Sequence, residues 1–289
     1  MSTTKQQTNW ISLIGVPNVG KSTLLNSLVG QKISIVTPKP QTTRNLIRGI
    51  KIINSTQLIF VDTPGIFAPK NQAGKIMVKR AWQGIAGVNQ IFLITDISKY
   101  NSSGNISIIK KLNQENARAS LIINKIDLIK KEELFEIINS MKELYSFENI
   151  FLVSALRKKG LKELLAHLVK TSVYEAWPFS KGEITDAPLK FQIAEIIREK
   201  IFMSTREEIP YNVDVEIPSI KDDQKLMSIE AEILVRSNSH KKILIGKGAS
   251  LIKKIGMTSR VELEKTLHKK VFLSTNVKVA RPSSSIGHE

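Results

Sequence analysis

A glycine-rich octet near the start of the chain has the composition of a phosphate-binding loop. Residues 15–22, GVPNVGKS, fit the pattern G-x-x-x-x-G-K-[ST] and stand between an apolar run, ISLIG, and a helical segment, STLLNSL. In this pattern the glycines let backbone N–H groups surround the phosphates, the lysine reaches the β and γ phosphates, and the hydroxyl faces Mg²⁺. The sequence therefore predicts a nucleoside triphosphate site formed by Gly15, Asn18, Val19, Gly20, Lys21, Ser22 and Thr23.

The segment NKID, residues 124–127, predicts that the base is guanine, because it closes an apolar run about 100 residues after the glycine loop. The Asp127 carboxylate can accept hydrogen bonds from guanine N1–H and the 2-amino group, whereas adenine would leave it unpaired at a cost of roughly 1 to 3 kcal/mol. The predicted base-binding residues also include Asn124, Lys125, Ser154, Ala155 and Leu156, the last three ending the next apolar run.

The sequence DTPG, residues 62–65, follows a third apolar run and supplies the expected γ-phosphate contacts. Asp62 is expected to hold the Mg²⁺ shell through water, and the Gly65 N–H to sense the γ-phosphate. Thr43, with Thr42 as the alternative, is expected to close over Mg²⁺ when the triphosphate is bound, which makes this segment a switch. The predicted Mg²⁺ ligands are Ser22, Thr43 and Asp62, and the predicted catalytic residues are Lys21, Thr43 and Gly65.

Short apolar runs that alternate with helical periodicity must position these residues. Five runs, ISLIG, QLIFVD, QIFLITD, ASLIINK and NIFLVSA, have the length of buried strands, and helices are expected to start near residues 22, 75, 105, 131 and 161. This order predicts an α/β domain with a mainly parallel sheet and its ligand at the carboxyl ends of the strands. The polar residues named above stand at those ends.

Length and composition indicate two domains. A chain of 289 residues exceeds the usual single-domain size. We predict a nucleotide domain over 1–174, a linker over 175–188, an α+β domain over 189–281 and a tail over 282–289. The absence of cysteine excludes disulfides and thiolate zinc sites. The polar N-terminus and the lack of a long apolar stretch predict neither a signal peptide nor a membrane span, and the absence of cysteine makes a reducing cytoplasm the simplest expected location.

The positive charge is unevenly distributed, and this predicts a polyanionic partner for the C-terminal part. Residues 181–235 carry 7 basic and 12 acidic side chains, whereas residues 236–281 carry 12 basic and two acidic ones. The basic stretch brackets a second glycine loop, LIGKGASLIKKIG at 244–256, which lacks the triphosphate pattern. A basic surface around such a loop favours nucleic acid over plain solvation.

The combination of GVPNVGKS, TTR, DTPG, NKID and SAL resembles the TrmE-Era-EngA group of translation-factor-class GTPases. Within that group, EIIREK at 195–200, IPY at 209–211 and the loop at 246 make residues 8–280 similar to the Era family. The resemblance implies a GTP-hydrolysing switch that binds the 3′ end of small-subunit ribosomal RNA and assists maturation of the small ribosomal subunit. It further implies Mg²⁺ as cofactor, GTP and GDP as ligands, and a monomer.

The second loop resembles the I-G-x-x-G-x-x-I loop of a type II KH domain, which clamps single-stranded RNA by its backbone. The implied RNA-binding residues are Gly246, Lys247, Gly248, Ala249, Ile252, Lys253 and Lys254. Ala249 departs from the glycine of the pattern and adds a methyl group where backbones approach closely.

One position departs from Ras-like enzymes and concerns catalysis. Ile66 stands where those enzymes have a glutamine that orients the attacking water, so the chain is expected to be slow on its own. Related GTPases without this glutamine hold K⁺ through an asparagine that matches Asn18; a capping role for Asn18 is an equal alternative. Arg44 is a less favoured candidate for catalysis in cis.

Two other functions stay open at this point. The chain can be a constitutive RNA-binding or chaperone module with structural GTP. Ile66 keeps this alternative open, whereas Thr43, Asp62 and Gly65 argue for a switch. The chain can also be a peripheral GTPase attracted to the inner membrane surface by its charge, although no concentrated amphipathic anchor supports that reading.

Overall fold

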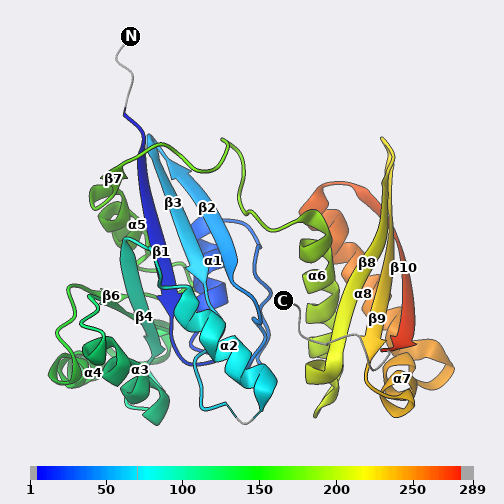
Figure 1. The fold of residues 1–289 in the computed structure, drawn as a ribbon, viewed down its shortest axis with the longest axis horizontal. Coiled ribbons are helices and arrows are strands. Elements are labelled where there is room, and N and C mark those ends of the chain that lie inside the picture. Colours follow the sequence, from blue (N-terminus) through cyan, green and yellow to red (C-terminus); the bar gives the residue numbers. More distant parts are fainter. Residues whose placement is uncertain (1–4, 70, 281–289) are drawn as a thin grey trace. The chain divides into compact units, whose positions relative to one another are not determined.

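The computed structural model describes residues 5–69 and 71–280, and the chain divides into two compact units, 1–186 and 187–289 (Figure 1). The predicted tail, 282–289, lies outside the described residues, as do residues 1–4, 70 and 281. Within the described part of the chain, no helix has both the length and the apolar character that crossing a membrane requires.

The first unit is an α/β domain built on a sheet with the order β2-β3-β1-β4-β5-β6. Strands β3, β1, β4, β5 and β6 are parallel to one another, as predicted, whereas β2 runs antiparallel to β3 and β7 antiparallel to β1. The strands are β1 (Gln7–Ile14), β2 (Ile47–Ile53), β3 (Thr56–Asp62), β4 (Gln90–Asp96), β5 (Ser120–Asn124), β6 (Ile150–Leu152) and β7 (Val173–Tyr174).

The apolar runs did not predict β2 because it is an edge strand. Its charged residues Arg48 and Lys51 interrupt the hydrophobic run, and Arg48 is exposed. An edge strand needs no continuous apolar sequence, since one side of it faces solvent.

Helices cover both faces of this sheet, as the βαβ order requires. They bury their apolar stripes against strands such as β3, every residue of which is buried. The helices are α1 (Lys21–Val29), α2 (Gln72–Gln83), α3 (Ser103–Gln114), α4 (Lys131–Leu144) and α5 (Leu161–Lys170), with a short turn η1 (Ile126–Leu128) after β5.

Most of the segment predicted as a linker, 175–188, lies against the first unit. The Trp177 indole N–H donates to the carbonyls of Gln7 and Ser55 (both 3.1 Å), and the Ile50 N–H donates to the Ile184 carbonyl (2.8 Å). The two units divide between Asp186 and Ala187.

The second unit is an α+β domain with the sheet order β10-β9-β8, in which β10 is parallel to β9 and β8 is antiparallel. Alternate residues of β9 from Met227 to Val235 are buried in the core beneath α6 and α8. Its elements are α6 (Leu189–Ser204), η2 (Ile209–Asn212), β8 (Val213–Asp222), β9 (Leu226–Val235), α7 (Asn238–Ile245), η3 (Lys247–Ala249), α8 (Ser250–Leu267) and β10 (Lys270–Val279).

Candidate functional site

The first glycine loop joins β1 to α1 and is held from within by Lys21. The buried Lys21 Nζ donates to the carbonyls of Gly15 (3.0 Å) and Val16 (3.1 Å), and the Ile66 N–H also donates to Gly15 (3.0 Å). Burial lowers the pKa of Lys21 to about 8; Asp62 opposes this shift, and nearby Lys99 contributes to it. A cation held without full solvation at a helix N-terminus is positioned to bind phosphate.

Side chains at the end of β5 and just after β4 and β5 hold the remaining carbonyls of the loop. The pairs are Lys99 Nζ to Pro17 (2.7 Å), Lys125 Nζ to Asn18 (2.9 Å) and Asn124 Nδ2 to Val19 (2.8 Å). All five carbonyls from residue 15 to residue 19 are therefore hydrogen-bonded to the protein. A backbone whose carbonyls are fixed in this way leaves its N–H groups for an anion.

Gly20 shows why the loop requires glycine. It has φ +94°, and a Cβ placed there would lie 2.4 Å from Nδ2 of Asn124. Any other residue at this position would therefore have a strained backbone, and its side chain would displace Asn124. The loop and the NKID segment are packed together as one unit.

The structure brings together three of the predicted metal-binding side chains. Ser22 Oγ donates to Asp62 Oδ2 (2.7 Å) and lies 3.0 Å from Thr43 Oγ1. Ser34 Oγ also donates to Asp62 Oδ2 (2.9 Å), a contact that the sequence did not predict. Thr42, the alternative to Thr43, points elsewhere and donates to the Lys39 carbonyl (2.8 Å).

These oxygens fit a magnesium ion. Asp62 is fully buried, and among the described residues its Oδ1 has no hydrogen-bond partner. Burial raises the pKa of Asp62, whereas Lys21 and the hydrogen bonds from Ser22 and Ser34 lower it. A buried carboxylate with one unsatisfied oxygen beside two hydroxyls is the oxygen-only donor set that Mg²⁺ prefers.

The predicted base-binding residues divide into structural and accessible ones. Buried Asn124 also accepts a hydrogen bond from the Ala155 N–H (3.0 Å), so it links the two loops rather than facing solvent. Asp127 is exposed, and a hydrogen bond from Ser154 holds the pKa of its carboxyl below the ordinary value. Leu156 is 75% exposed. Asp127 is therefore an ionised acceptor that is open to a base.

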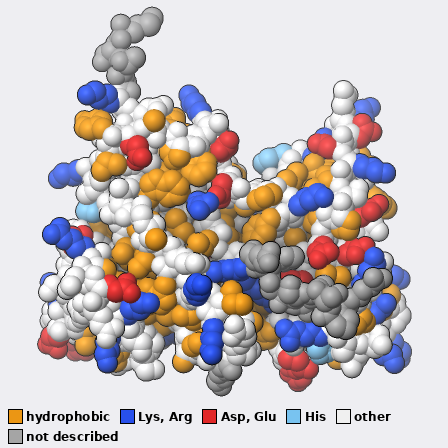
Figure 2. All heavy atoms as spheres, viewed as in Figure 1, with side chains coloured by type: hydrophobic (Ala, Val, Ile, Leu, Met, Phe, Trp, Pro, Cys, Tyr) orange, Lys and Arg blue, Asp and Glu red, His pale blue; other side chains and the backbone are white. Residues whose placement is uncertain are grey.

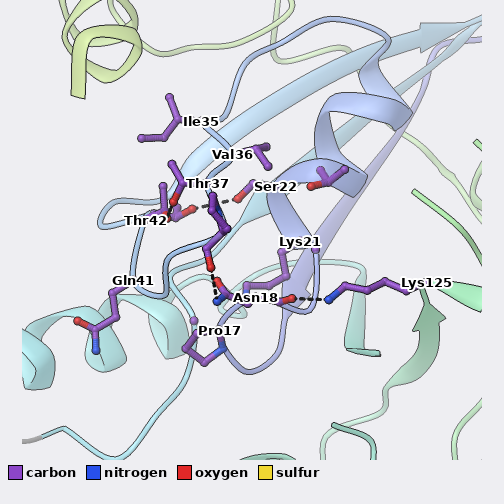
Figure 3. A pocket seen from close by; sticks show the side chains of 15 residues that line it. Pro17, Asn18, Lys21, Ser22, Ile35, Val36, Thr37, Gln41, Thr42 and Lys125 are labelled. Atoms are coloured by element: carbon purple, nitrogen blue, oxygen red, sulfur yellow. Dashed lines mark hydrogen bonds between the residues drawn. The ribbon is translucent and has the colours of Figure 1, made fainter. Parts of the chain in front are cut away.

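A cavity of about 520 Å³ lies between the glycine loop and the segment that contains Thr43. Figure 3 shows Ile35, Val36 and Thr37 on one side, with Asn18 and Lys21 on the other. Its lining also includes Gly20, Ser22, Thr23, Thr43, Gly65 and Lys125. The cavity thus joins the phosphate loop to the predicted switch segment.

The second glycine loop ends α7 and begins α8. Gly246 has φ +74° and ψ 170°, and a Cβ there would lie 2.9 Å from Leu251 Cβ. Ala249 adopts the left-handed conformation at φ +61°, so the chain has the backbone expected of glycine at this position. Lys247, Lys253 and Lys254 are exposed, and half-buried Ile252 packs against the core.

Sequence reasoning missed Asp96 and Lys99, which lie beside the phosphate loop. Asp96 ends β4 and pairs with Lys125 (2.5 Å), and Lys99 follows three residues later. The available signal was the aspartate that ends the strand QIFLITD and the lysine three residues later, because the carboxyl ends of parallel strands meet at the ligand site. No known motif covers these two residues, so their spacing alone did not single them out.

Comparisons with known proteins decide the family. The family model described as "50S ribosome-binding GTPase" matches residues 10–125, and the KH domain model matches residues 208–284. GTPase Era from Ehrlichia ruminantium strain Gardel is 42% identical over 270 residues, which are 93% of this chain and 91% of the relative. This chain belongs to the Era family of GTPases. The Era protein of Ruminiclostridium cellulolyticum is likewise 42% identical, over 94% of this chain and 92% of its own length.

Solved Era structures have the same fold over nearly the whole chain. An Era crystal structure in complex with MgGDPNP and nucleotides 1506–1542 of 16S ribosomal RNA is 36% identical, with a TM-score of 0.90 over 96% of this chain and 95% of that one. An Aquifex aeolicus Era variant bound to GDP and AlF₄⁻ is 35% identical with the same TM-score and the same coverage. The Era family fold thus includes both the GTPase unit and the KH unit.

Proposed function

We propose that this Era-family GTPase binds GTP with Mg²⁺, hydrolyses it slowly, and uses the nucleotide state to control its hold on the 3′ end of small-subunit ribosomal RNA during maturation of that subunit. The observation that carries the proposal is the contact of Ser22 with both Asp62 and Thr43. These residues come from the phosphate loop, the DTPG segment and the switch segment. They meet at one buried site, and the γ-phosphate would be sensed there.

The side chains of this chain divide the work of GTP binding. Lys21 supplies positive charge to the β and γ phosphates, and the backbone N–H of Gly65 donates to the γ-phosphate. Ser22, Thr43 and Asp62 would hold Mg²⁺, which when bound neutralises charge on the β and γ phosphates. Asp127 selects guanine, because its exposed carboxylate accepts hydrogen bonds from N1–H and the 2-amino group of that base.

Slow hydrolysis follows from Ile66, whose side chain is buried and carries no group that could orient water. We propose that Asn18 compensates by offering its side-chain oxygen to K⁺ near the phosphate loop. Asn18 Nδ2 donates to the Pro38 carbonyl (3.0 Å), and its Oδ1 accepts no hydrogen bond from the described residues. Replacing K⁺ by Na⁺ should reduce turnover several-fold, and equal rates in the two salts would contradict the role of Asn18.

The RNA part of the proposal rests on residues 246–254. Three exposed lysines surround a loop in which Gly246 and Gly248 both have positive φ, so an RNA backbone can approach the loop closely. The solved relative that carries 16S ribosomal RNA nucleotides supports the same class of ligand for this chain.

The test is the affinity for a single-stranded RNA from the small-subunit 3′ end, measured with GDP and with a non-hydrolysable GTP analogue in KCl at fixed ionic strength. We expect tighter binding with the analogue. Gly246→Asp should remove the binding that depends on the 246–249 loop, because the new Cβ meets Leu251. Equal binding in both nucleotide states would instead support a constitutive RNA-binding module with structural GTP. Sedimentation with anionic liposomes at physiological salt tests the remaining alternative, peripheral membrane association, and the expected result is that the protein stays in the supernatant.

A further inference from the structure

The first unit contains a second cavity, of about 510 Å³, which lies on α2 and α3 away from the nucleotide site. We call it the α2–α3 groove and define it by Lys75, Lys79 and Trp82 of α2 and Lys111 of α3. None of the residues proposed above for GTP, Mg²⁺ or RNA lines it. Its chemistry therefore needs a separate explanation.

The α2–α3 groove is strongly basic. Helix α2 contains no acidic residue, and residues 65–114 contain seven basic side chains and one acidic side chain, Asp96, which is buried. On the face shown in Figure 2, Lys and Arg side chains lie along α2. Glu115 is an acidic neighbour of the groove and pairs with Lys111 at 3.6 Å. A groove lined by three ammonium groups attracts a polyanion.

Trp82 distinguishes between the polyanions that could bind. The indole is half-buried, and Lys111 Nζ lies 4.1 Å from the centre of its ring. An acidic peptide would use the lysines but would gain little from a flat aromatic ring. A single-stranded nucleic acid uses both the lysines and the ring. Its phosphates pair with lysines, and its bases stack on aromatic side chains or lie beside a cation that sits over such a ring.

Helix α2 is connected to both segments that face the γ-phosphate. It begins at Gln72, shortly after the DTPG segment, and Arg80 donates a hydrogen bond to Asn45 Oδ1, two residues beyond Thr43. Nucleotide bound at the phosphate loop can therefore influence α2 through these two segments, so the groove is tested with the GTP analogue bound.

We propose that the α2–α3 groove is a second RNA-binding site, which holds single-stranded RNA by its phosphates and by stacking on Trp82. It is distinct from the 246–249 loop and takes RNA without regard to sequence. The site gives the GTPase unit a contact with RNA that does not depend on the KH unit.

The test uses the full chain, with the GTP analogue bound and with Gly246→Asp to remove the loop site, and a labelled twelve-nucleotide oligouridylate as the probe. We expect Lys75→Glu with Lys79→Glu to weaken binding at least about tenfold and to lower the salt slope by about 1.4, the value for two lost phosphate contacts. The matched control is Lys142→Glu with Lys162→Glu, the same charge change at exposed positions of α4 and α5. The control pair should retain most of the affinity.

Tryptophan fluorescence gives a direct signal for the ring. Oligouridylate should quench the emission of the Gly246→Asp chain, and Trp82→Phe should abolish that quenching. Equal weakening by the groove pair and the control pair, or quenching that survives Trp82→Phe, would overturn the proposal. If polyglutamate of matched charge displaces oligouridylate from the chain, the groove is instead a site for an acidic protein.

Failure of the groove proposal can be distinguished from failure of the proposed RNA site at the 246–249 loop. If the groove is inert, the groove pair leaves binding of the 3′-end RNA unchanged in a chain with intact Gly246. If the loop is inert, Gly246→Asp leaves that binding unchanged while the groove pair weakens it.

Discussion

Lys99 is a positioning residue that no motif in the sequence pointed to. It holds the Pro17 carbonyl at 2.7 Å and adds positive charge beside Lys21. We expect Lys99→Met to weaken binding of GTP about tenfold, equivalent to about 1.4 kcal/mol, because the loop loses a charge-assisted hydrogen bond. Lys99→Arg should restore most of the affinity, and Lys110→Met is the control at an exposed position. Unchanged affinity in Lys99→Met, measured with a fluorescent GTP analogue, would contradict this role.

The lowered pKa of Lys21 predicts how nucleotide binding depends on pH. Phosphate binding favours the protonated amine, and the free site loses this proton near pH 8. The dissociation constant of the GTP analogue should therefore rise above pH 8, by up to about tenfold per pH unit. A dissociation constant that stays the same from pH 7.5 to 9.5 would contradict this prediction.

The same pKa shift makes the free energy of unfolding of the nucleotide-free chain rise with pH, whereas it makes nucleotide binding weaken with pH. The folded pKa, about 8, lies below the ordinary value of 10.5, so the unfolded chain binds more protons between these limits. The contribution of Lys21 to the free energy of unfolding therefore rises with pH across this window and is lost as the pH falls through about 8.

At the scale of elements, the junction between α7 and α8 depends on two glycines in different ways. Gly246, at φ +74° and ψ 170°, occupies a region almost restricted to glycine and has Leu251 against it, whereas Gly248, at φ +58°, has open space around it. We expect Gly246→Ala to cost roughly 1 to 3 kcal/mol of strain and to abolish RNA binding at the 246–249 loop. Gly248→Ala should cost about 1 kcal/mol and retain binding. Urea unfolding and RNA affinity of the pair provide the test, and equal losses would refute it.

The whole molecule consists of two units with separate cores. Core residues of the second unit, from Ile193 to Val277, form a cluster of their own. We expect thermal unfolding of the full chain to show two transitions. GTP analogue at a hundred times its dissociation constant should stabilise only the first unit, by about 2.7 kcal/mol. A single transition that shifts as a whole with nucleotide would contradict this independence.

The sequence by itself determined the fold class, the phosphate loop and the KH loop. These features follow from local patterns, because GVPNVGKS and LIGKGASLIKKIG specify turns between short elements whose periodicity is visible along the chain. The edge strand β2 escaped prediction because burial on one side does not require a continuous apolar run.

Only the tertiary structure decided which distant residues act together. It placed Thr43 rather than Thr42 beside Ser22, brought Lys99 to the Pro17 carbonyl, and aligned lysines of α2 and α3 around Trp82. The parallel sheet brings together strand ends that are far apart in the sequence, and Asn124 contacts Val19 across 105 positions. A linear pattern does not encode which side chains meet there. Packing and hydrogen bonding between elements make that selection.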